Sequence, residues 1–425
     1  MKLLHTCAEE SSVHGLHHLV AKNRHWLERL FWTVIIICSL YSSYAICLTT
    51  WERYQKHPIV LTLQTDYRNW IYRPPAVTIC PSYINELQSK EMIHRLWNIT
   101  EIHAKFNYYN QYLHTIANAT YNNLVSFVPF EGDASLDNVD MLEAAWTVRR
   151  LEFLPSSYFQ PVITEMGMCF SSSNFSYLQN ASSTVNYRNR TWPNSCSSFD
   201  YCKSTVVVSA YGKARINLYV HTEDEVMTAT DTISSEMGGN EQVKIALWVD
   251  QIVASSNLKH ISPVRRKCIY QHETSSNFRV HTPQLCKIDC RIKKALKICN
   301  CIPFFYNIAH LVKCNASGMV CLSRKFHNWY DASCPCMEQC ESTKFTQLSI
   351  SILKILQLNN QLSVEMFFPK RRIKRSVLFN LSDLVVSFGG AAALFLGSSF
   401  LSAVEFLYFF LEYIGITIGQ FLSKH

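Results

Sequence analysis

Cysteine shows the clearest chemical pattern in this chain. Fourteen of the 17 cysteines lie between positions 80 and 340, and ten of those fall between 268 and 340. An even number confined to one stretch predicts seven disulfides formed in an oxidising compartment. Zinc binding is the alternative role for these cysteines, but C-x-C spacing without paired histidines makes a poor zinc knuckle. The residues therefore favour a disulfide framework, and their spacing leaves the pairing open.

A second group of residues could bind a cation inside a membrane. Gly397, Ser398 and Ser399 interrupt an apolar segment. Irregular backbone at membrane depth is tolerated only where it is buried or lines water, and carbonyl and hydroxyl oxygens can replace the hydration of a cation. Glu405 and Glu412 follow, seven residues apart on one helical face, and intramembrane carboxylates usually face a pore. The alternatives are a helix-packing face of small residues and a Glu412 that reaches back to the membrane surface.

Two charge-free runs would position these residues. Residues 30–51 and 384–404 are each long enough to cross about 30 Å of hydrocarbon as a helix, and the second stretch stays largely apolar to residue 419. A signal peptide is disfavoured for the first run because 29 residues precede it and no A-x-A-like site follows. Two spans would leave both termini on one side of the membrane. The expected organisation is a cytoplasmic segment 1–29, spans 30–51 and 384–419, a domain 52–383, and a tail 420–425.

The predicted domain between the spans is placed outside the cell by its cysteines and its N-glycosylation sequons. These sequons lie at Asn98, Asn118, Asn174, Asn180, Asn189 and Asn315, with a seventh at Asn380 close to the membrane. Its secondary structure reads as α+β. We expect a strand pair over 204–225 that turns at Tyr211-Gly212, a strand over 241–255, and a helix over 286–301.

Composition excludes several classes of protein. The chain is 48% hydrophobic and 17% charged, which leaves ample material for a core and argues against disorder. The net charge of +8 is scattered and forms no basic stripe, so nucleic-acid binding is not indicated. No Ser/His/Asp set, metal cluster or phosphate loop supports an enzyme.

Several local motifs together resemble the degenerin/epithelial sodium channel family. SSVHGL at 11–16 resembles its cytoplasmic His-Gly motif, and PAVTIC at 75–80 resembles the strand after its first span. FGGAAALFLGSSFLSAVEFLYFF at 388–410 resembles its pore helix with the G-x-S filter. SPVRRKC and CRIKKALKICNCIPFFY are similar to the insect pickpocket branch. The resemblance covers nearly the whole chain.

The resemblance implies a two-transmembrane-helix protein that forms a trimeric, sodium-selective, amiloride-sensitive channel. Its large disulfide-rich α+β ectodomain would be hand-like, with palm, finger, knuckle, β-ball and a thumb over 268–340. The selectivity filter would be Gly397, Ser398 and Ser399, the inner mouth Glu405 and Glu412, and the gating residues His14, Gly15, Val386, Gly389 and Gly390. The implied disulfides are Cys80–Cys202, Cys169–Cys196, Cys268–Cys340, Cys286–Cys336, Cys290–Cys334, Cys299–Cys321 and Cys301–Cys314.

The chain departs from the family pattern at some positions. Val386 stands where a small residue is usual, which suggests either a less stable closed state or a subunit that works in mixed trimers. No Trp precedes Cys268, whereas acid-sensing relatives have an aromatic residue there that couples the thumb to the wrist. Glu223-Asp224-Glu225 has no evident second acidic cluster to face it, so proton gating is unsupported. The basic run 372–375 fits a processing site, but a contact with lipid head groups is favoured.

The expected function is a subunit of a plasma-membrane sodium channel opened by an extracellular chemical ligand or by force, in sensory neurons. Its partners would be related subunits in a homo- or heterotrimer, the lipid bilayer and an unidentified extracellular ligand. Apart from the permeant Na⁺, no cofactor is expected. The alternative is a non-conducting auxiliary or receptor subunit that binds ligands or partners through the cysteine-rich domain.

Overall fold

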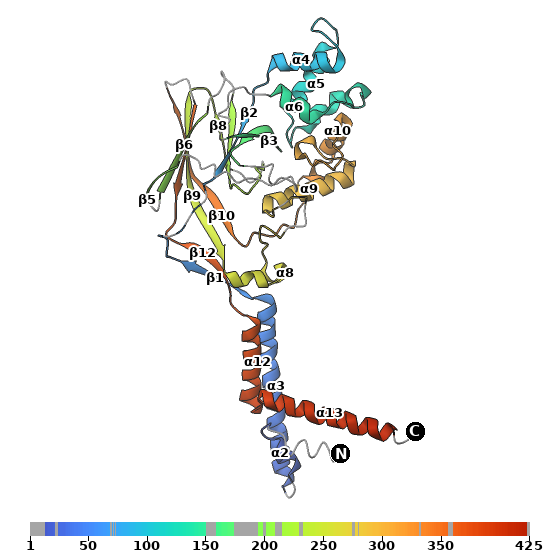
Figure 1. Ribbon diagram of the computed structural model, residues 1–425, viewed down its shortest axis with the longest axis vertical. Helices are drawn as coiled ribbons and strands as arrows, with labels where there is room; N and C mark the ends of the chain where they lie inside the picture. Colours follow the sequence, from blue (N-terminus) through green and yellow to red (C-terminus); the bar gives the residue numbers. More distant parts are fainter. Residues whose placement is uncertain are drawn as a thin grey trace. The chain divides into compact units, whose positions relative to one another are not determined.

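The computed structural model describes residues 13–21, 24–68, 70, 72, 74–149, 159–173, 194–198, 201–208, 215–228, 233–273, 277–278, 280–330, 333–355 and 360–422 (Figure 1). The chain divides into two compact units. The first comprises residues 1–61, 255–266 and 375–425, and the second comprises 62–254 and 267–374.

The first unit is mainly helical. Its helices are α2 (Leu16–Val20), α3 (Trp26–Lys56), η3 (Ser256–His260), α8 (Pro263–Arg266), α12 (Leu381–Leu396) and α13 (Phe400–Leu422). Local sequence explains where two of them begin. The His25 side chain accepts a hydrogen bond from the Leu27 amide at the start of α3, and Asn380 and Asp383 form a capping box at the start of α12. In Figure 1, α12 runs beside α3.

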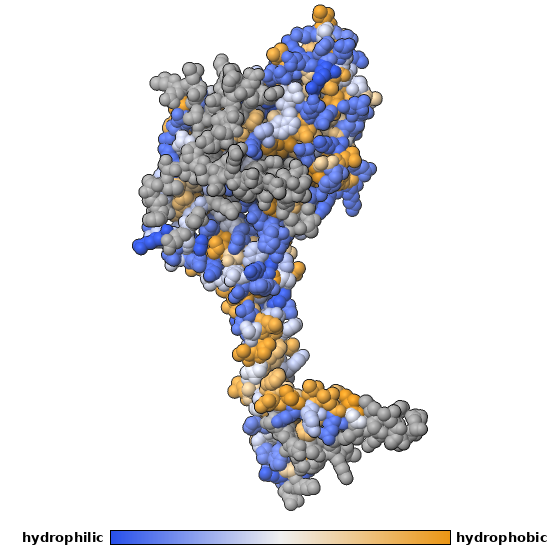
Figure 2. Space-filling view, in the orientation of Figure 1, coloured by the Kyte–Doolittle hydropathy of each residue, from blue (hydrophilic) through white to orange (hydrophobic). Residues whose placement is uncertain are grey.

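Among the described helices, only α3 is long and apolar enough to cross a membrane by itself. α12 and the part of α13 up to Glu412 meet that criterion only as a pair, which is bent by 84° at the break between them. Apolar side chains cover the visible sides of α3 and α12 (Figure 2). The first predicted span therefore has a matching helix. The second remains a prediction that treats the bent pair as one span.

The strands form two sheets. The seven-stranded sheet has the order β1-β12-β9-β11-β6-β5, with β10 also paired to β9, and the five-stranded sheet has the order β3-β4-β2-β7-β8. The bounds are β1 (Ile59–Gln64), β2 (Ala76–Pro81), β3 (Gln160–Thr164), β4 (Gly167–Ser171), β5 (Asn194–Ser198), β6 (Tyr201–Val208), β7 (Ile216–His221), β8 (Ile233–Met237), β9 (Glu241–Ala254), β10 (Ser342–Lys354), β11 (Asn360–Phe367) and β12 (Arg372–Val377).

A hydrophobic core lies between these two sheets. On β9 every second residue from Val243 to Val249 is fully buried, which is the alternation expected of a strand with one face in a core. These residues pack in one cluster with Val77 of β2 and Leu218 of β7 from the other sheet. The strand predicted over 241–255 is therefore present, and it provides one wall of this core.

The predicted strand pair over 204–225 is wrong. β6 and β7 are both strands, but β6 pairs with β5 and β11, whereas β7 pairs with β2 and β8. They belong to different sheets, because each finds its partners elsewhere in the chain. The turn expected at Tyr211-Gly212 lies outside the described residues.

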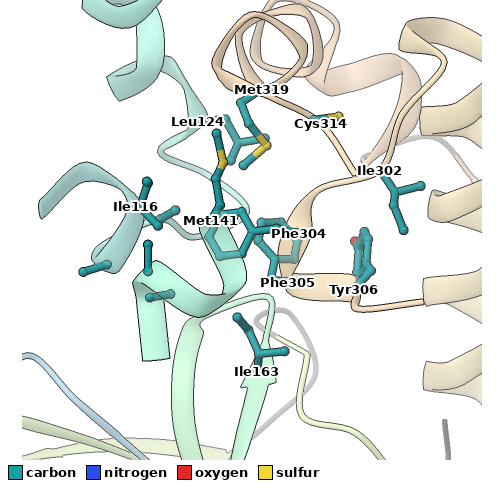
Figure 3. Close-up of a cluster of buried hydrophobic side chains, with 14 of the residues drawn as sticks. Ile116, Leu124, Met141, Ile163, Ile302, Phe304, Phe305, Tyr306, Cys314 and Met319 are labelled. Carbon is teal, nitrogen blue, oxygen red and sulfur yellow. The ribbon is translucent and has the colours of Figure 1, made fainter. Parts of the chain in front are cut away.

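The helices of the second unit share a second core (Figure 3). Ile116, Leu124 and Met141 from the segment 86–148 pack with Phe304 and Met319 from the segment 283–329. These helices are α4 (Glu86–Trp97), α5 (Phe106–Ala117), η1 (Leu124–Phe130), η2 (Ala134–Leu136), α6 (Met141–Val148), α9 (Pro283–Cys299), η4 (Phe304–Tyr306), α10 (Ala316–Arg324) and α11 (Phe326–Trp329). The segments 86–148 and 283–329, called finger-like and thumb-like below, are thus joined by one continuous apolar core.

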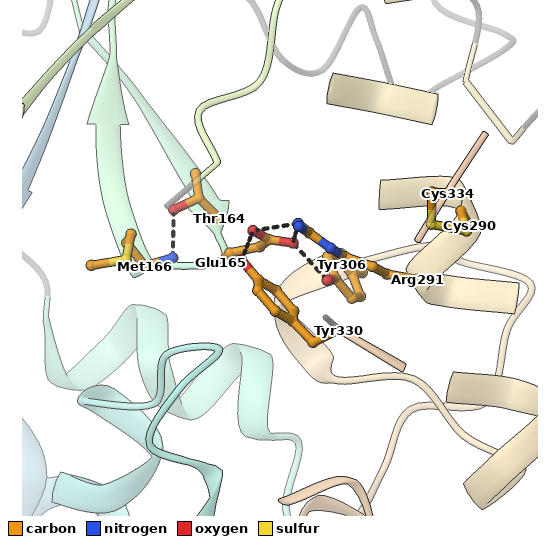
Figure 4. Close-up of polar contacts among 8 residues, drawn as sticks. All are labelled: Thr164, Glu165, Met166, Cys290, Arg291, Tyr306, Tyr330 and Cys334. Carbon is orange, nitrogen blue, oxygen red and sulfur yellow. Dashed lines mark hydrogen bonds and ion pairs between the residues drawn. A yellow bond between two sulfur atoms is a disulfide. The ribbon is translucent and has the colours of Figure 1, made fainter. Parts of the chain in front are cut away.

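A buried ion pair also links the β3–β4 turn to the thumb-like segment (Figure 4). Arg291 Nη1 of α9 donates to both carboxylate oxygens of Glu165, at 2.8 and 3.1 Å. The hydroxyls of Tyr306 and Tyr330 donate to the same carboxylate at 2.7 and 2.9 Å. Burial first, and then the charge of Glu165, raise the pKa of both tyrosines, so both hydroxyls remain donors.

Five disulfides hold the segment 268–340 together. They are Cys268–Cys340, Cys286–Cys336, Cys290–Cys334, Cys299–Cys321 and Cys301–Cys314. This is the pairing that the family resemblance implies for these ten cysteines. Cys286 and Cys290 lie one turn apart on α9, and their partners follow in reverse order, so the bridges fasten α9 to a chain segment that returns antiparallel.

The other two expected disulfides differ in the structure, which joins Cys80 to Cys169. The expected pairings Cys80–Cys202 and Cys169–Cys196 are therefore wrong. The physical reason is the strand register. Ile79 of β2 lies opposite Phe170 of β4, so Cys80 and Cys169 are cross-strand neighbours within disulfide reach. Cys202 is disulfide-bonded too, and the β5–β6 ladder places Cys196 opposite it.

This pairing can be tested by peptide mapping. We expect non-reducing digestion of the glycosylated, surface-expressed chain to give a linked peptide pair that contains Cys80 and Cys169, because adjacent strands hold these residues together. Mass spectrometry before and after reduction identifies the pair, and the Cys286–Cys336 peptide pair serves as the internal control. A linked pair that contains Cys80 and Cys202 would contradict the register.

Candidate functional site

α12 has two distinct faces. Leu384 and Ala391, seven residues apart and therefore on the same side of a helix, are buried where α12 packs along α3. Val386, Gly389 and Gly390 lie on the opposite side and are exposed. A methyl group added at either glycine would meet no atom within 4 Å. The structure thus places three of the predicted gating residues on an open face of α12.

The predicted filter residues form the turn between α12 and α13. Gly397 has φ 60°, a left-handed conformation that glycine adopts with least strain and that commonly ends a helix. Its amide donates to the Ala393 carbonyl at 3.0 Å, and the Ser398 amide donates to the Ala392 carbonyl at 3.4 Å. Ser399 directly precedes α13. The break is therefore a defined turn, closed by hydrogen bonds on the α12 side.

The His-Gly pair of the predicted gating set lies against this turn. The His14 amide donates to the Leu396 carbonyl at 3.1 Å, and so caps the last residue of α12. A Cβ atom built on Gly397 would overlap the His14 ring at Nδ1. Gly15 has φ 94°, and a Cβ there would lie 3.3 Å from the Ile36 side chain of α3. The fold thus brings predicted gating and filter residues together, although nearly 400 positions separate them in sequence.

The two acidic residues of the predicted inner mouth lie on α13, after the break. Glu405 is half-buried and Glu412 is exposed within the single chain. Val386, which stands where a small residue is usual in the family, is 72% exposed. Within the single chain its larger side chain is therefore accommodated, and the expected effect on the closed state concerns contacts with other subunits.

Arg265 is a contact residue that the sequence did not single out. Its guanidinium lies 4.0 Å above the centre of the Tyr54 ring, near the end of α3, and its Nη2 donates to the Tyr54 carbonyl at 2.7 Å. The Tyr54 ring meets Phe379, just before α12, edge-on at 6.5 Å. One arginine before Cys268 therefore contacts the end of one apolar helix and, through Tyr54, the start of the other. The string SPVRRKC, which contains Arg265, is present in the sequence, but no neighbouring residue indicates that Arg265 contacts Tyr54.

A cavity of about 250 Å³ lies in the second unit, beside the ends of β7 and β9 and the start of β10. Glu223 and Asp224 line it, as does Glu341, which directly follows Cys340. The sequence offered no second acidic cluster to face Glu223 and Asp224. The structure adds one acidic residue, which comes from more than 100 positions away.

His221, next to that cavity, is buried and neutral. Its Nδ1–H donates to the Thr222 carbonyl at 2.8 Å, and its Nε2 accepts from Thr78 Oγ1 at 2.7 Å. Burial lowers the pKa of His221 from 6.5 to about 4.

Acid should therefore destabilise the fold at this position. Between pH 6.5 and pH 4 the unfolded chain binds a proton that the folded chain excludes, so stability falls as pH drops through this window, by roughly 3 kcal/mol in total. Thermal unfolding of the purified chain at pH 7 and pH 4.5 measures the loss. His221→Gln should show a smaller difference between the two pH values, and an equal difference would contradict the assignment.

The predicted modification sites are only partly described. Asn98, Asn118 and Asn315 are exposed. Asn315 also caps α10, and its Nδ2 donates to Asp137 Oδ1 at 2.7 Å. The sites Asn174, Asn180 and Asn189 lie outside the described residues. The basic run 372–375 belongs to β12, which pairs on both sides, with β1 and β9, and this disfavours protease access.

In the described part of the chain, no group of three or more His, Cys, Asp or Glu residues is placed to hold a metal ion.

Comparisons with known proteins complete the description. Residues 7–409 match the family model described as amiloride-sensitive sodium channel. The chain is 22% identical to "Sodium channel protein Nach" of Drosophila ananassae over 442 residues, which cover 94% of this chain and 84% of that protein. It is 20% identical to "Pickpocket protein 11" of Drosophila melanogaster over 426 residues, which cover 94% of this chain and 74% of that protein.

Among solved structures, a proton-activated chloride channel aligns with 91% of this chain and 96% of its own, at 7% identity and a TM-score of 0.26. That score is too low to support an argument.

Proposed function

Because the chain belongs to the amiloride-sensitive sodium channel family, we propose that it is a pore-forming subunit of a trimeric, sodium-selective channel in the plasma membrane. Membership makes it a membrane protein of an ion-channel family rather than an enzyme. Both termini would be cytoplasmic, with α3 as the first span and the bent pair α12–α13 as the second.

The observation that carries this proposal is the combination of an open α12 face with a defined turn at its end. Gly389 and Gly390 leave space for close approach of another helix, which is how membrane helices associate. Three copies of the turn at Gly397–Ser399 would surround an axis with backbone carbonyls, the groups that replace the hydration shell of a permeating ion. Glu405 and Glu412 would add a negative potential that favours cations.

We propose that an extracellular chemical ligand or force acts on the disulfide-rich second unit to open the channel. The channel would be sensitive to amiloride and would work in sensory neurons. The names of two relatives, a sodium channel protein and a pickpocket protein, support the sodium-channel part of the proposal. An exposed β-branched Val386 on the open face of α12 favours assembly with related subunits that have a small residue there. The alternative function is a non-conducting auxiliary subunit. Current recordings distinguish it from a pore-forming subunit.

Voltage-clamp recording tests the proposal. The chain is expressed alone and with related subunits, and current is measured in sodium and in potassium, with and without amiloride. We expect an amiloride-blocked sodium current in at least one combination, and altered permeation or block by cadmium when Ser399→Cys is introduced. Surface-expressed chain that gives no such current in any combination, or current that Ser399→Cys leaves unaltered and unblocked, would overturn the pore-forming role.

Arg265→Ala should alter gating without preventing surface expression, because it removes both the hydrogen bond to Tyr54 and the stacking on its ring. The two contacts together correspond to about 1–3 kcal/mol, which is about a 5- to 150-fold change in the open–closed equilibrium. Open probability is read from single-channel records. Arg265→Lys keeps the charge and should recover part of the effect, and Val264→Ala, at an exposed neighbour, serves as the control. Unchanged open probability in Arg265→Ala would show that the contacts between Arg265 and Tyr54 do not affect gating.

A further inference from the structure

The start of α13 is closed by a reciprocal pair of hydrogen bonds between Ser399 and Ser402. The Ser399 amide donates to Ser402 Oγ at 3.0 Å, and the Ser402 amide donates to Ser399 Oγ at 3.4 Å. The two hydroxyl oxygens are 3.4 Å apart. This is the geometry of a capping box, in which the residue before a helix and the residue three positions on satisfy each other's amides. Ser402 is 2% exposed, so its hydroxyl is held inside the protein.

This pair changes the role of Ser399. Its hydroxyl is engaged at the start of α13, where it accepts the Ser402 amide. The oxygen atoms that three copies of the turn would present to an ion are then mainly the backbone carbonyls of Gly397, Ser398 and Ser399. The directions of those carbonyls depend on the backbone angles of the turn.

Both ends of the turn fix these angles. On the α12 side the Gly397 and Ser398 amides donate to carbonyls of the last turn of that helix. On the α13 side the Ser399 amide is held by Ser402 Oγ. Removal of that oxygen would leave a backbone amide at the start of a helix without this partner, and the turn could adopt other conformations.

We infer that Ser402 is a positioning residue for ion selection, which sets the geometry of the Gly397–Ser399 carbonyls for a partly dehydrated monovalent cation without touching the ion. This inference rests on the proposed function. A purely structural role predicts something different: loss of the cap would lower the amount of folded chain and leave the selectivity of the remaining channels unchanged.

Two measurements on the full chain separate these outcomes. The variants are Ser402→Ala, which removes the oxygen, Ser402→Cys, which replaces it with a weaker acceptor, and Ser402→Thr, which restores a hydroxyl. Ser387→Ala, another serine of the same apolar segment but within α12, is the matched control. Surface biotinylation normalises every recording.

The first measurement is the reversal potential under sodium and potassium. We expect the sodium-to-potassium permeability ratio to fall about fivefold in Ser402→Ala and in the same direction in Ser402→Cys, the size of change that loss of one capping hydrogen bond makes in a local equilibrium. Ser402→Thr should recover the ratio, and Ser387→Ala should not change it. An unchanged ratio per surface channel in both Ser402→Ala and Ser402→Cys would overturn the inference.

The second measurement does not need current. Backbone amide exchange over residues 397–405 is followed by mass spectrometry on the purified chain in lipid nanodiscs. Faster exchange in Ser402→Ala and Ser402→Cys, but not in Ser402→Thr, is expected, and unchanged exchange would also overturn the inference. If the wild-type chain gives no sodium current with any partner, the proposed function fails by itself, and the exchange data still decide whether Ser402 holds the turn.

Discussion

Replacing Glu165 with glutamine is expected to destabilise the second, disulfide-rich unit of this protein by about 3–5 kcal/mol, because Arg291 would remain buried without its counter-charge. The pair is almost completely buried, with 8% of the Arg291 side chain and 1% of the Glu165 side chain exposed. Burial alone would lower the pKa of Arg291, but the Glu165 charge offsets this effect and holds the pKa above its usual value. The guanidinium also stacks on the Tyr330 ring at 3.8 Å, so it has no route to solvent without disruption of the packing.

The measurement is thermal unfolding of the purified chain together with its yield at the cell surface. Glu131→Gln is the matched control, because Glu131 also pairs with an arginine, Arg324 at 2.7 Å, but in a largely exposed position. That change should cost less than about 1 kcal/mol. Glu165→Leu combined with Arg291→Leu should recover much of the loss, since removal of both charges leaves none unpaired. Equal unfolding temperatures for Glu165→Gln and wild type would show that the buried pair does not support the fold.

The second large effect is expected at Gly397. Gly397→Ala places a Cβ where the His14 ring lies, against Nδ1. The φ of 60° at this position also costs a residue with a side chain about 1–2 kcal/mol. Because the clash involves the turn and the segment that caps α12, we expect loss of most of the channel current while the disulfide-rich unit still folds and reaches the surface. Current per surface channel is the measurement.

Two comparisons separate the sources of this effect. Gly415→Ala on α13 adds a methyl group that meets no atom within 4 Å, so it should leave the current unchanged. His14→Ala combined with Gly397→Ala removes the clash but keeps the backbone strain, and should recover only part of the current. Wild-type current in Gly397→Ala would mean that His14 does not lie against the turn.

The shared core and the buried Glu165 also bear on how a stimulus could act. Apolar side chains from the finger-like and thumb-like segments form one cluster, and the exposed Glu131–Arg324 pair links the same segments at their surface. Relative motion of these segments would have to break that core. A ligand or force acting on either segment would therefore move both together with the β3–β4 turn that carries Glu165.

Local sequence patterns determined much of this protein. The charge-free run at 30–51 predicted α3, the β-branched residues over 241–255 predicted β9, and the Gly-Ser-Ser interruption predicted the break before α13. These features depend on residues within one or two turns or on one strand, so a short window of sequence contains their cause. The ten cysteines between 268 and 340 paired as the family resemblance implied, whereas their spacing by itself had left the pairing open.

Only the tertiary structure decided the remaining contacts. Cys80 pairs with Cys169 because β4 lies beside β2, and the strand pair predicted over 204–225 failed because β6 and β7 entered different sheets. Glu165 meets Arg291 across 126 positions, and the His14 amide finds the Leu396 carbonyl from the other end of the chain. Each of these contacts depends on which distant segments the fold brings together, and that is set by packing of whole elements, for which a single stretch of sequence carries no local signal.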